Sequence, residues 1–336
     1  MIIEIEMWFE DLMGFEEQSP DNVRNKISII GNKLLSLVNN ESYQFGRLEI
    51  PTLKELKQQA QKVGNKGVMS INEIVSDVQD LHSKPSNRNA LFQAASQFNL
   101  LEMVGPHISP ERGVGIYEHD YTQGPACAIA CGAGTIYRNY FASVNNQIGQ
   151  SSSNQINCLE LIEKELGNDK EALWSMRNGY ALASRGGIAK INAQLNNVCQ
   201  SQREQLKEKL KIGIQWDTEV TIGESNHLVS QAYCSALPVA YSDIAFVYWE
   251  SFARLILEAS YEATLYAALI NHGRTGCPKV FLTLVGGDAF GNKAEWILDA
   301  LELSVSKFKN TPLKINIVSY GASNHELVAL INKLNG

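Results

Sequence analysis

Residues 280–292 constrain the fold of this chain more than any other part of its sequence. Residues 280–285 form a continuous apolar run, which is typical of a strand buried on both faces. Three glycines follow, and residues 293–307 then show a helical pattern. A buried strand, a glycine-rich turn and a helix N-terminus together predict an anion site, because free backbone N–H groups converge there. The turn matches neither the P-loop nor the full dinucleotide fingerprint. A tight turn that binds nothing is the alternative interpretation.

Composition limits the classes of function. The chain has 336 residues and a formal net charge of −7, and no basic face is evident, which argues against a nucleic-acid partner. Its six cysteines form no Cys-x-x-Cys pair and have no histidine at zinc spacing, so we expect reduced thiols and no metal. The acidic N-terminus does not resemble a signal peptide, and no apolar run is long enough for a membrane helix. We therefore expect a cytoplasmic protein with no membrane partner.

The first quarter of the chain reads as helical. Apolar residues at helical spacing predict a helix over residues 21–38, and Pro51 opens a second helix over residues 51–63. Ser70 and Glu73 have capping-box spacing, which predicts a third helix over residues 70–81. Residues 1–85 are accordingly predicted to be a helical accessory region.

The remainder, residues 86–336, is predicted to be one α/β domain with a mostly parallel sheet flanked by helices. Strands and helices alternate in its C-terminal half. The predicted strands are residues 89–95, 212–222, 228–237, 280–285 and 313–320. The predicted helices are residues 159–166, 170–184, 187–210 (broken), 244–270, 293–307 and 325–334.

In a sheet of this kind, ligands bind at the carboxyl ends of the strands. Three predicted strand ends are therefore of interest: those that lead into residues 96–102, 286–292 and 321–324. A loop at residues 120–125 precedes a helix rich in alanine and glycine, and it would face the same side. Two interpretations fit these small residues: close packing of the helix on a neighbouring element, and a ligand that contacts its first turn.

These segments resemble the macrodomain superfamily, and in particular its poly(ADP-ribose) glycohydrolase-like branch. The glycine turn resembles the phosphate-binding loop of that fold, and residues 93–96 (Gln-Ala-Ala-Ser) resemble the strand end that reads Asn-Ala-Ala-Asn in macrodomains. Residues 93–102, 122–125, 233–241 and 249–265 are most similar to the MavL-type effector ADP-ribosylhydrolases, which remove ADP-ribose from modified ubiquitin. The similarity spans about residues 89–335. Two departures are the Gln-Ala-Ala-Ser sequence itself and Asp288, whose carboxylate is unfavourable beside a diphosphate.

The resemblance implies a fold that holds ADP-ribose, as ligand or product, and requires no cofactor. The glycine turn would hold the diphosphate, through Gly286, Gly287, Asp288, Ala289, Phe290, Gly291 and Asn292. Contacts to the distal ribose would come from Gln97, Asn99, Thr122, Gln123 and Gly124. Tyr241 would stack on the adenine, although simple packing is the alternative for a loop tyrosine.

Cleavage of a glycosidic bond at the distal ribose needs a carboxyl group, because the transition state resembles an oxocarbenium ion. Asp120 is the first choice, since it directly precedes the loop expected to meet that ribose, and Glu102 is the second. The alternatives are that Asp120 complements a helix dipole and that Glu102 is a surface carboxylate.

The expected function is therefore hydrolysis of mono-ADP-ribose from a modified protein, with ubiquitin as a candidate target and the cytoplasm, or a host cytosol, as the location. Two other functions fit the same residues. One is a non-catalytic ADP-ribose reader, since a fold does not determine an activity. The other is a scaffold whose helices and acidic surface bind partner proteins.

Overall fold

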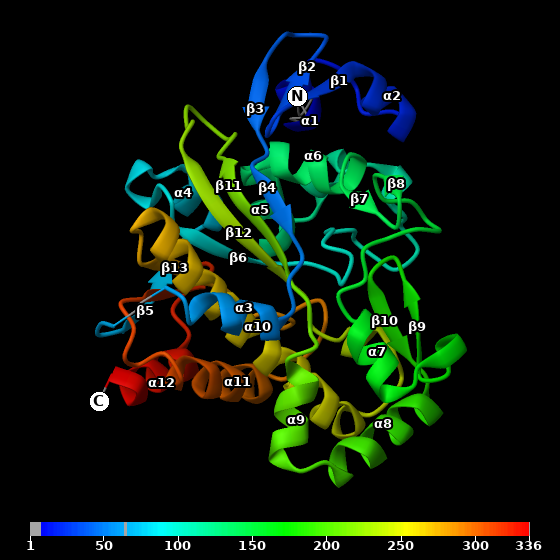
Figure 1. Ribbon diagram of the computed structural model, residues 1–336, viewed down its shortest axis with the longest axis vertical. Coiled ribbons are helices and arrows are strands. Elements are labelled where there is room, and N and C mark those ends of the chain that lie inside the picture. The colour runs from blue at the N-terminus through cyan, green and yellow to red at the C-terminus, as the bar shows by residue number, and fades with distance from the viewer. Residues whose placement is uncertain (1–7, 64–65, 336) are drawn as a thin grey trace.

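A seven-stranded sheet forms the centre of the computed structural model, which describes residues 8–63 and 66–335 (Figure 1). Residues 1–7, on which the expectation about a signal peptide depends, lie outside this range. The strand order is β4 (Arg47–Glu49), β11 (Gly213–Glu219), β12 (Leu228–Cys234), β6 (Leu91–Ala95), β13 (Lys279–Leu282), β14 (Lys314–Ser319) and β5 (Ser70–Val75). The last five strands are parallel, and β11 is antiparallel to both of its neighbours. The predicted mostly parallel α/β sheet is confirmed.

Helices cover both faces of this sheet, as the side chains of β12 show. Gln231 contacts α4 (Val78–Ser83) and α5 (Gln123–Ala130) through His82 and the Cys127 carbonyl. Cys234, three residues further along the strand, instead faces Thr264 on α10 (Phe246–Thr275). Successive strand side chains point to opposite faces. The sheet therefore lies between α4, α5 and α6 (Gly132–Tyr140) on one side and α10 on the other.

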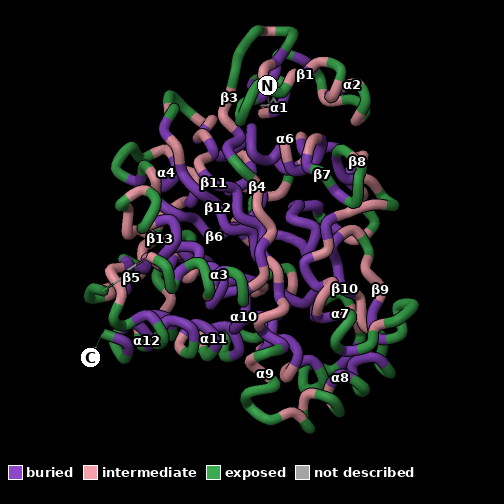
Figure 2. The backbone as a smooth tube through the Cα atoms, viewed as in Figure 1, coloured by how far each residue is buried: buried purple, intermediate pink, exposed green. Residues whose placement is uncertain are grey.

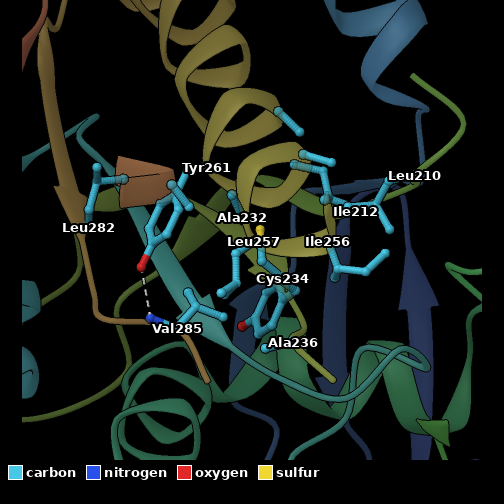
Figure 3. Packing of buried hydrophobic residues seen from close by; sticks show 14 of the residues in the cluster. Leu210, Ile212, Ala232, Cys234, Ala236, Ile256, Leu257, Tyr261, Leu282 and Val285 are labelled. Atoms are coloured by element: carbon cyan, nitrogen blue, oxygen red, sulfur yellow. Dashed lines mark hydrogen bonds between the residues drawn. The ribbon is translucent and has the colours of Figure 1, made fainter. Parts of the chain in front are cut away.

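Helix α10 is the centre of the main hydrophobic core. It packs against α3 (Leu53–Ala60), α8 (Arg185–Asn197), α9 (Gln200–Lys207) and α11 (Ala294–Ser306) as well as the sheet. Most of its residues are buried, because the sheet covers one side of the helix and other helices cover the rest (Figure 2). Its Tyr261 hydroxyl accepts a hydrogen bond from the amide of Val285, at 3.0 Å, which fixes the chain just after β13 (Figure 3).

A second, smaller hydrophobic core lies between the N-terminal segment and residues of α5, α6 and the chain before them. Helices α1 (Trp8–Met13) and α2 (Pro20–Lys26) lie beside a three-stranded sheet of β1 (Ile27–Ile30), β2 (Lys33–Ser36) and β3 (Ser42–Gln44). The predicted helix over residues 21–38 is therefore wrong beyond Lys26. Isoleucines favour a strand there, and the turn at Gly31, whose φ is +62°, reverses the chain.

The predicted helix over residues 70–81 is also wrong. Residues Ser70–Val75 form the edge strand β5, and Asp77 rather than Ser70 caps the helix that follows, by accepting a hydrogen bond from the Gln79 amide. Ile71, Ile74 and Val75 are β-branched, and the free edge of β14 supplies a pairing partner. Since β4 and β5 pair with strands beyond residue 86, residues 1–85 are not purely helical. The domain boundary itself stays a prediction.

A hairpin replaces the predicted helix over residues 170–184. Strands β9 (Trp174–Arg177) and β10 (Tyr180–Ala183) are joined by Asn178 and Gly179, both with positive φ. This is a type I′ arrangement, which Asn-Gly favours. A second short hairpin is formed by β7 (Ser143–Val144) and β8 (Gln147–Ile148).

The other predicted elements are present with shifted ends. Helix α7 is Glu160–Leu166, the predicted break in residues 187–210 falls between α8 and α9, and α12 is His325–Asn335. Strand β13 ends at Leu282, so residues 283–285 already belong to the turn. No described helix combines the length and apolarity needed to cross a membrane.

Candidate functional site

The carboxyl ends of β6, β12 and β13, three neighbouring strands, surround a cavity of about 190 Å³. The turn after β13 forms one wall, and the segment after β6 together with the start of α5 forms the opposite one. Most residues expected at the site line this cavity: Gln97, Glu102, Asp120, Thr122, Gln123, Gly124, Tyr241, Gly286, Gly287, Asp288, Ala289 and Phe290. The third strand end of interest, residues 321–324, lies elsewhere, because Glu73 accepts hydrogen bonds from Ser323 and from the Asn324 amide.

The glycine turn is closed by its own backbone and presents free amides. Gly291 donates to the Gly287 carbonyl at 2.7 Å, and Asn292 donates to the Gly286 carbonyl at 2.8 Å. Gly286 has φ +80°, and a Cβ there would lie 2.3 Å from the Cβ of Ala236, so only glycine fits. Within residues 8–63 and 66–335, no acceptor is found for the amides of Asp288, Ala289 and Phe290. The arrangement is that of an anion-binding turn.

Two residues of the turn support it instead of lining the cavity. The Asn292 amide group donates to the carbonyls of Leu237 and Gly286, both at 2.9 Å, and so ties the turn to the chain after β12. Gly291, at φ +70°, packs closely on Ala240. Of the residues expected to hold the diphosphate, Gly291 and Asn292 are therefore not on the cavity wall.

Asn99, expected to contact the distal ribose, is not among the residues that line the cavity. It is fully buried outside the cavity, where its amide nitrogen donates to Gln155 at 2.9 Å and its oxygen accepts from the Leu101 amide. Gln97 does line the cavity, but its side-chain oxygen accepts from the Met103 amide at 2.8 Å. Both side chains shape the segment that carries Glu102.

The start of α5 lies directly on the end of β6. A Cβ at Gly124 would be 2.0 Å from the Ala95 carbonyl oxygen, so this contact requires glycine. Gln123 accepts a hydrogen bond from the Ala95 amide at 2.9 Å and donates to the Gln93 carbonyl at 2.8 Å. The small residues of this helix therefore allow close packing, and the packing brings exposed Thr122 to the cavity rim.

Glu102 has the most unusual environment in the cavity. Its exposed fraction is 2%, and neither carboxyl oxygen has a hydrogen-bond partner in the described structure. The nearest cation is Arg138, with Nη2 3.9 Å from Oε2. Burial raises the pKa of Glu102 to about 8, although the charge of Arg138 and the nearby Tyr117 hydroxyl oppose this rise. Glu102 is therefore largely protonated at neutral pH and able to donate a proton.

Asp120 lies at the rim, half-buried. One of its carboxylate oxygens accepts a hydrogen bond from the Thr122 amide at 2.9 Å, which forms an Asx turn ahead of α5. Both carboxyl groups ranked from the sequence line the cavity. Glu102 has the stronger chemical case, because it is the buried one, and burial depends on tertiary packing that the sequence pattern does not reveal.

Three aromatic rings meet at the cavity mouth. Tyr241 contacts Tyr180 and Phe290, with ring centroids 5.1 Å and 5.8 Å apart, and Tyr180 and Phe290 are 5.3 Å apart. Tyr241 is still 36% exposed, so one part of its ring is free to contact a ligand. Sequence reasoning missed Tyr180, which was placed in a helix. The Asn-Gly turn before it was the available signal for a strand.

Asp288 is exposed on the turn, and no described lysine or arginine pairs with it. A negative charge at this position partly offsets the attraction of the turn amides for an anion. No described cluster of histidine, cysteine, aspartate or glutamate could hold a metal ion.

Comparisons with known proteins add solved structures with a similar arrangement. The poly(ADP-ribose) glycohydrolase from Thermomonospora curvata bound to the inhibitor ADP-HPD has a TM-score of 0.44 at 9% identity, over 93% of this chain and 95% of that one. The Deinococcus radiodurans enzyme in complex with ADP-ribose has a TM-score of 0.46 at 7% identity, over 86% and 93%. No protein-family model and no curated protein matches the sequence. Because the scores and identities are low, the function is argued from the cavity.

Proposed function

We propose that this cavity binds ADP-ribose and that Glu102 takes part in hydrolysing the bond between ADP-ribose and a modified protein. The observation that carries the proposal is the pairing of two opposite features across one cavity. Unpaired amides of the glycine turn suit a diphosphate, and a buried, unpaired carboxyl group faces the same space. A structural turn alone would not account for Glu102, because an unpartnered buried carboxyl is costly to the folded state.

The orientation of the ligand follows from the chemistry of the walls. The free amides of residues 288–290 would hold the diphosphate, and Tyr241 would stack on the adenine at the mouth. The distal ribose would then lie toward Glu102, Asp120 and Thr122. Since Tyr241, Thr122 and Asp288 are open to solvent, the protein part of the substrate can remain outside the cavity.

Glu102 would act first as an acid. Its carboxyl proton passes to the leaving atom on the modified protein as the bond to the ribose C1″ breaks. The Asp120 carboxylate stabilises the positive charge that develops on the ribose. A water molecule then adds to C1″ and returns a proton to the Glu102 carboxylate, so the products are ADP-ribose and the unmodified protein. No metal or cofactor enters this scheme.

The target remains part of the proposal. The resemblance of residues 233–241 and 249–265 to the MavL-type hydrolases implies removal of a single ADP-ribose, with ubiquitin as the first protein to test and the cytosol as the location. Poly(ADP-ribose) is the second substrate to test. The expected outcome is release from mono-ADP-ribosylated ubiquitin that exceeds release from the polymer.

The decisive assay compares binding with turnover. We expect the wild-type protein to bind free ADP-ribose in a calorimetric titration and to release it from mono-ADP-ribosylated ubiquitin. Glu102→Gln should retain binding and lower the release rate by about 100-fold or more, as for loss of a general acid. Binding with no wild-type release would identify a reader, and absence of binding at millimolar ADP-ribose would support the scaffold function.

A further inference from the structure

Arg138, on α6, is a fully buried cation, and no carboxylate of the described residues lies at hydrogen-bond distance from it. Its Nε donates to the Leu100 carbonyl at 3.1 Å, and its Nη2 donates to the Thr135 hydroxyl at 3.1 Å. The guanidinium carbon lies 3.6 Å from the centre of the Tyr233 ring. Nη1 has no acceptor among the residues described. Burying a charge in this way lowers the stability of the folded state, and this cost indicates a role beyond packing.

The contacts of Arg138 converge on the segment that carries Glu102. Leu100 has φ +66°, a conformation that a leucine rarely adopts, and its carbonyl is held by Arg138. Gln150 links the same two elements, because its amide nitrogen donates to the carbonyls of Asn99 and Arg138. Arg138 therefore fixes the backbone two residues before Glu102 and also faces the Glu102 carboxyl group.

We propose that Arg138 is a positioning residue for the reaction at Glu102: it holds that segment in place and supplies the positive charge that the Glu102 carboxylate faces after it has given up its proton. The inference rests on the proposed function. Nη2 lies 3.9 Å from the carboxyl oxygen, which is too far for a hydrogen bond but close enough for strong attraction in a buried site. Arg138 thus favours ionisation of the Glu102 carboxyl group without forming a hydrogen bond to the carboxyl oxygen that must contact the substrate.

The other titratable groups around Glu102 do not provide this charge. Tyr117 from the 3-10 helix Gly115–His119 accepts a hydrogen bond from the Glu102 amide at 3.0 Å, and Asp120 lies on the same rim. Tyr233 on β12 and Cys127 on α5 also lie within electrostatic range. Each of these is neutral or negative. Of the groups named, only Arg138 lowers the pKa of Glu102 by its charge.

The test is the pH dependence of ADP-ribose release from mono-ADP-ribosylated ubiquitin. Glu102 is active in its protonated form, so wild-type kcat/KM should fall as the pH rises through the pKa of about 8. Arg138→Gln removes the attraction that favours the carboxylate, so the alkaline limb should move to higher pH by about one unit or more. Arg138→Lys keeps the charge and loses the planar fork, so its limb should stay in place while kcat falls.

A second pair of variants covers the case in which Arg138→Gln does not fold. Thr135→Val removes the hydroxyl that orients Nη2, and Thr135→Ser retains it. We expect kcat to fall about threefold or more in the first variant, with unchanged affinity for ADP-ribose, and to stay near the wild-type value in the second. The positioning role would be overturned if the alkaline limb of the kcat/KM profile lay at the same pH in wild type and in both Arg138 variants. Equal kcat values in the two Thr135 variants would also overturn it.

A readout without turnover separates this inference from the proposed function. The pKa of Glu102 also affects the pH dependence of the melting temperature. It is read from the difference in melting temperature, at each pH, between the protein with Glu102 and the Glu102→Gln variant. In an Arg138→Gln background this difference should begin at higher pH than in the wild-type background. An unmoved onset would refute the electrostatic part of the inference even if no substrate is hydrolysed.

Discussion

At the scale of single residues, Glu102 combines burial with the absence of any described hydrogen-bond partner. Most buried carboxyl groups in this protein are paired; Glu262, for example, is contacted by Lys57, Lys207 and Lys307. Those lysines help hold the pKa of Glu262 below its usual range, whereas burial raises the pKa of Glu102. The contrast identifies Glu102 as a group maintained at a cost to stability, which is common at functional sites.

This cost has a measurable pH dependence. The folded-state pKa of Glu102, about 8, exceeds its ordinary value of 4.5, so between these pH values the folded state binds the proton more tightly than the unfolded state. Stability from this group is therefore complete at low pH and is lost as the pH rises toward 8 and above. Glu102→Gln should be more stable than wild type at pH 9, by on the order of a few kcal/mol, and similar at pH 5.

Differential scanning calorimetry at the two pH values measures this effect. The control is Glu295→Gln, an exposed carboxyl at the start of α11, which should show little change at either pH. A stability gain in Glu102→Gln that is equal at both pH values would contradict a buried, protonated carboxyl.

Sequence reasoning at this scale names both carboxyl groups that line the cavity, but it has no information on which of them is buried. Asp120 was preferred because it precedes the loop before α5, and chain proximity is all that a sequence offers. The burial of Glu102 results from α6, through Arg138, and from Tyr117, which are far apart in the chain. For the same reason Asn99 could not be recognised as a structural residue, since its partner Gln155 is remote in sequence.

At the scale of elements, the strand–turn–helix unit around residue 286 was the best predicted part of the molecule. Its signal is local: a buried strand, glycines and a helical pattern follow one another without a long-range contact. The predicted helices are wrong at residues 27–36, 70–75 and 174–183 because the spacing of the apolar residues there also fits a helix. The strands that pair with these segments decide the structure, and they are distant in the chain or joined by a short turn.

Two neighbouring glycines allow a matched test of this unit. Gly286→Ala would place a Cβ 2.3 Å from that of Ala236 at φ +80°, so we expect a loss of stability on the order of 2 kcal/mol and loss of ADP-ribose binding. At Gly287 the nearest atom to an added Cβ is the Leu284 carbonyl oxygen, at an ordinary 3.4 Å. Gly287→Ala should therefore keep stability and binding. Chemical denaturation and calorimetric titration measure both, and equal effects of the two variants would contradict the described turn.

At the scale of the whole molecule, the carboxylate of Glu17 is one of several groups that join the N-terminal unit (residues 8–45) to the part of the chain that carries the site. Glu17 accepts hydrogen bonds from the amides of Val114 and Gly115, at 2.9 Å and 2.6 Å, and from the Tyr140 hydroxyl at 2.6 Å. The segment so fixed leads directly into the 3-10 helix that carries Tyr117 and then to Asp120. The unit therefore stabilises the loop at one side of the cavity.

A tyrosine pair on α6 tests this connection. Tyr140→Phe removes one donor to the Glu17 carboxylate and should lower the free energy of unfolding by about 1.5–3 kcal/mol, the range for a hydrogen bond to a charged group. Tyr137→Phe, whose ring stacks on Phe45, should change it by less than about 0.5 kcal/mol, because no described group bonds its hydroxyl. Urea denaturation compares them, and equal losses would show that Glu17 does not anchor the unit.

The central claim is that one molecule of ADP-ribose spans the cavity, with its diphosphate on the glycine turn and its distal ribose beside Glu102. A crystal structure of the Glu102→Gln protein with ADP-ribose tests this claim most directly. The predicted result is diphosphate oxygens within hydrogen-bond distance of the amides of residues 288–290, with the ribose C1″ next to residue 102. A ligand bound elsewhere, or a distal ribose turned away from residue 102 toward solvent, would contradict it.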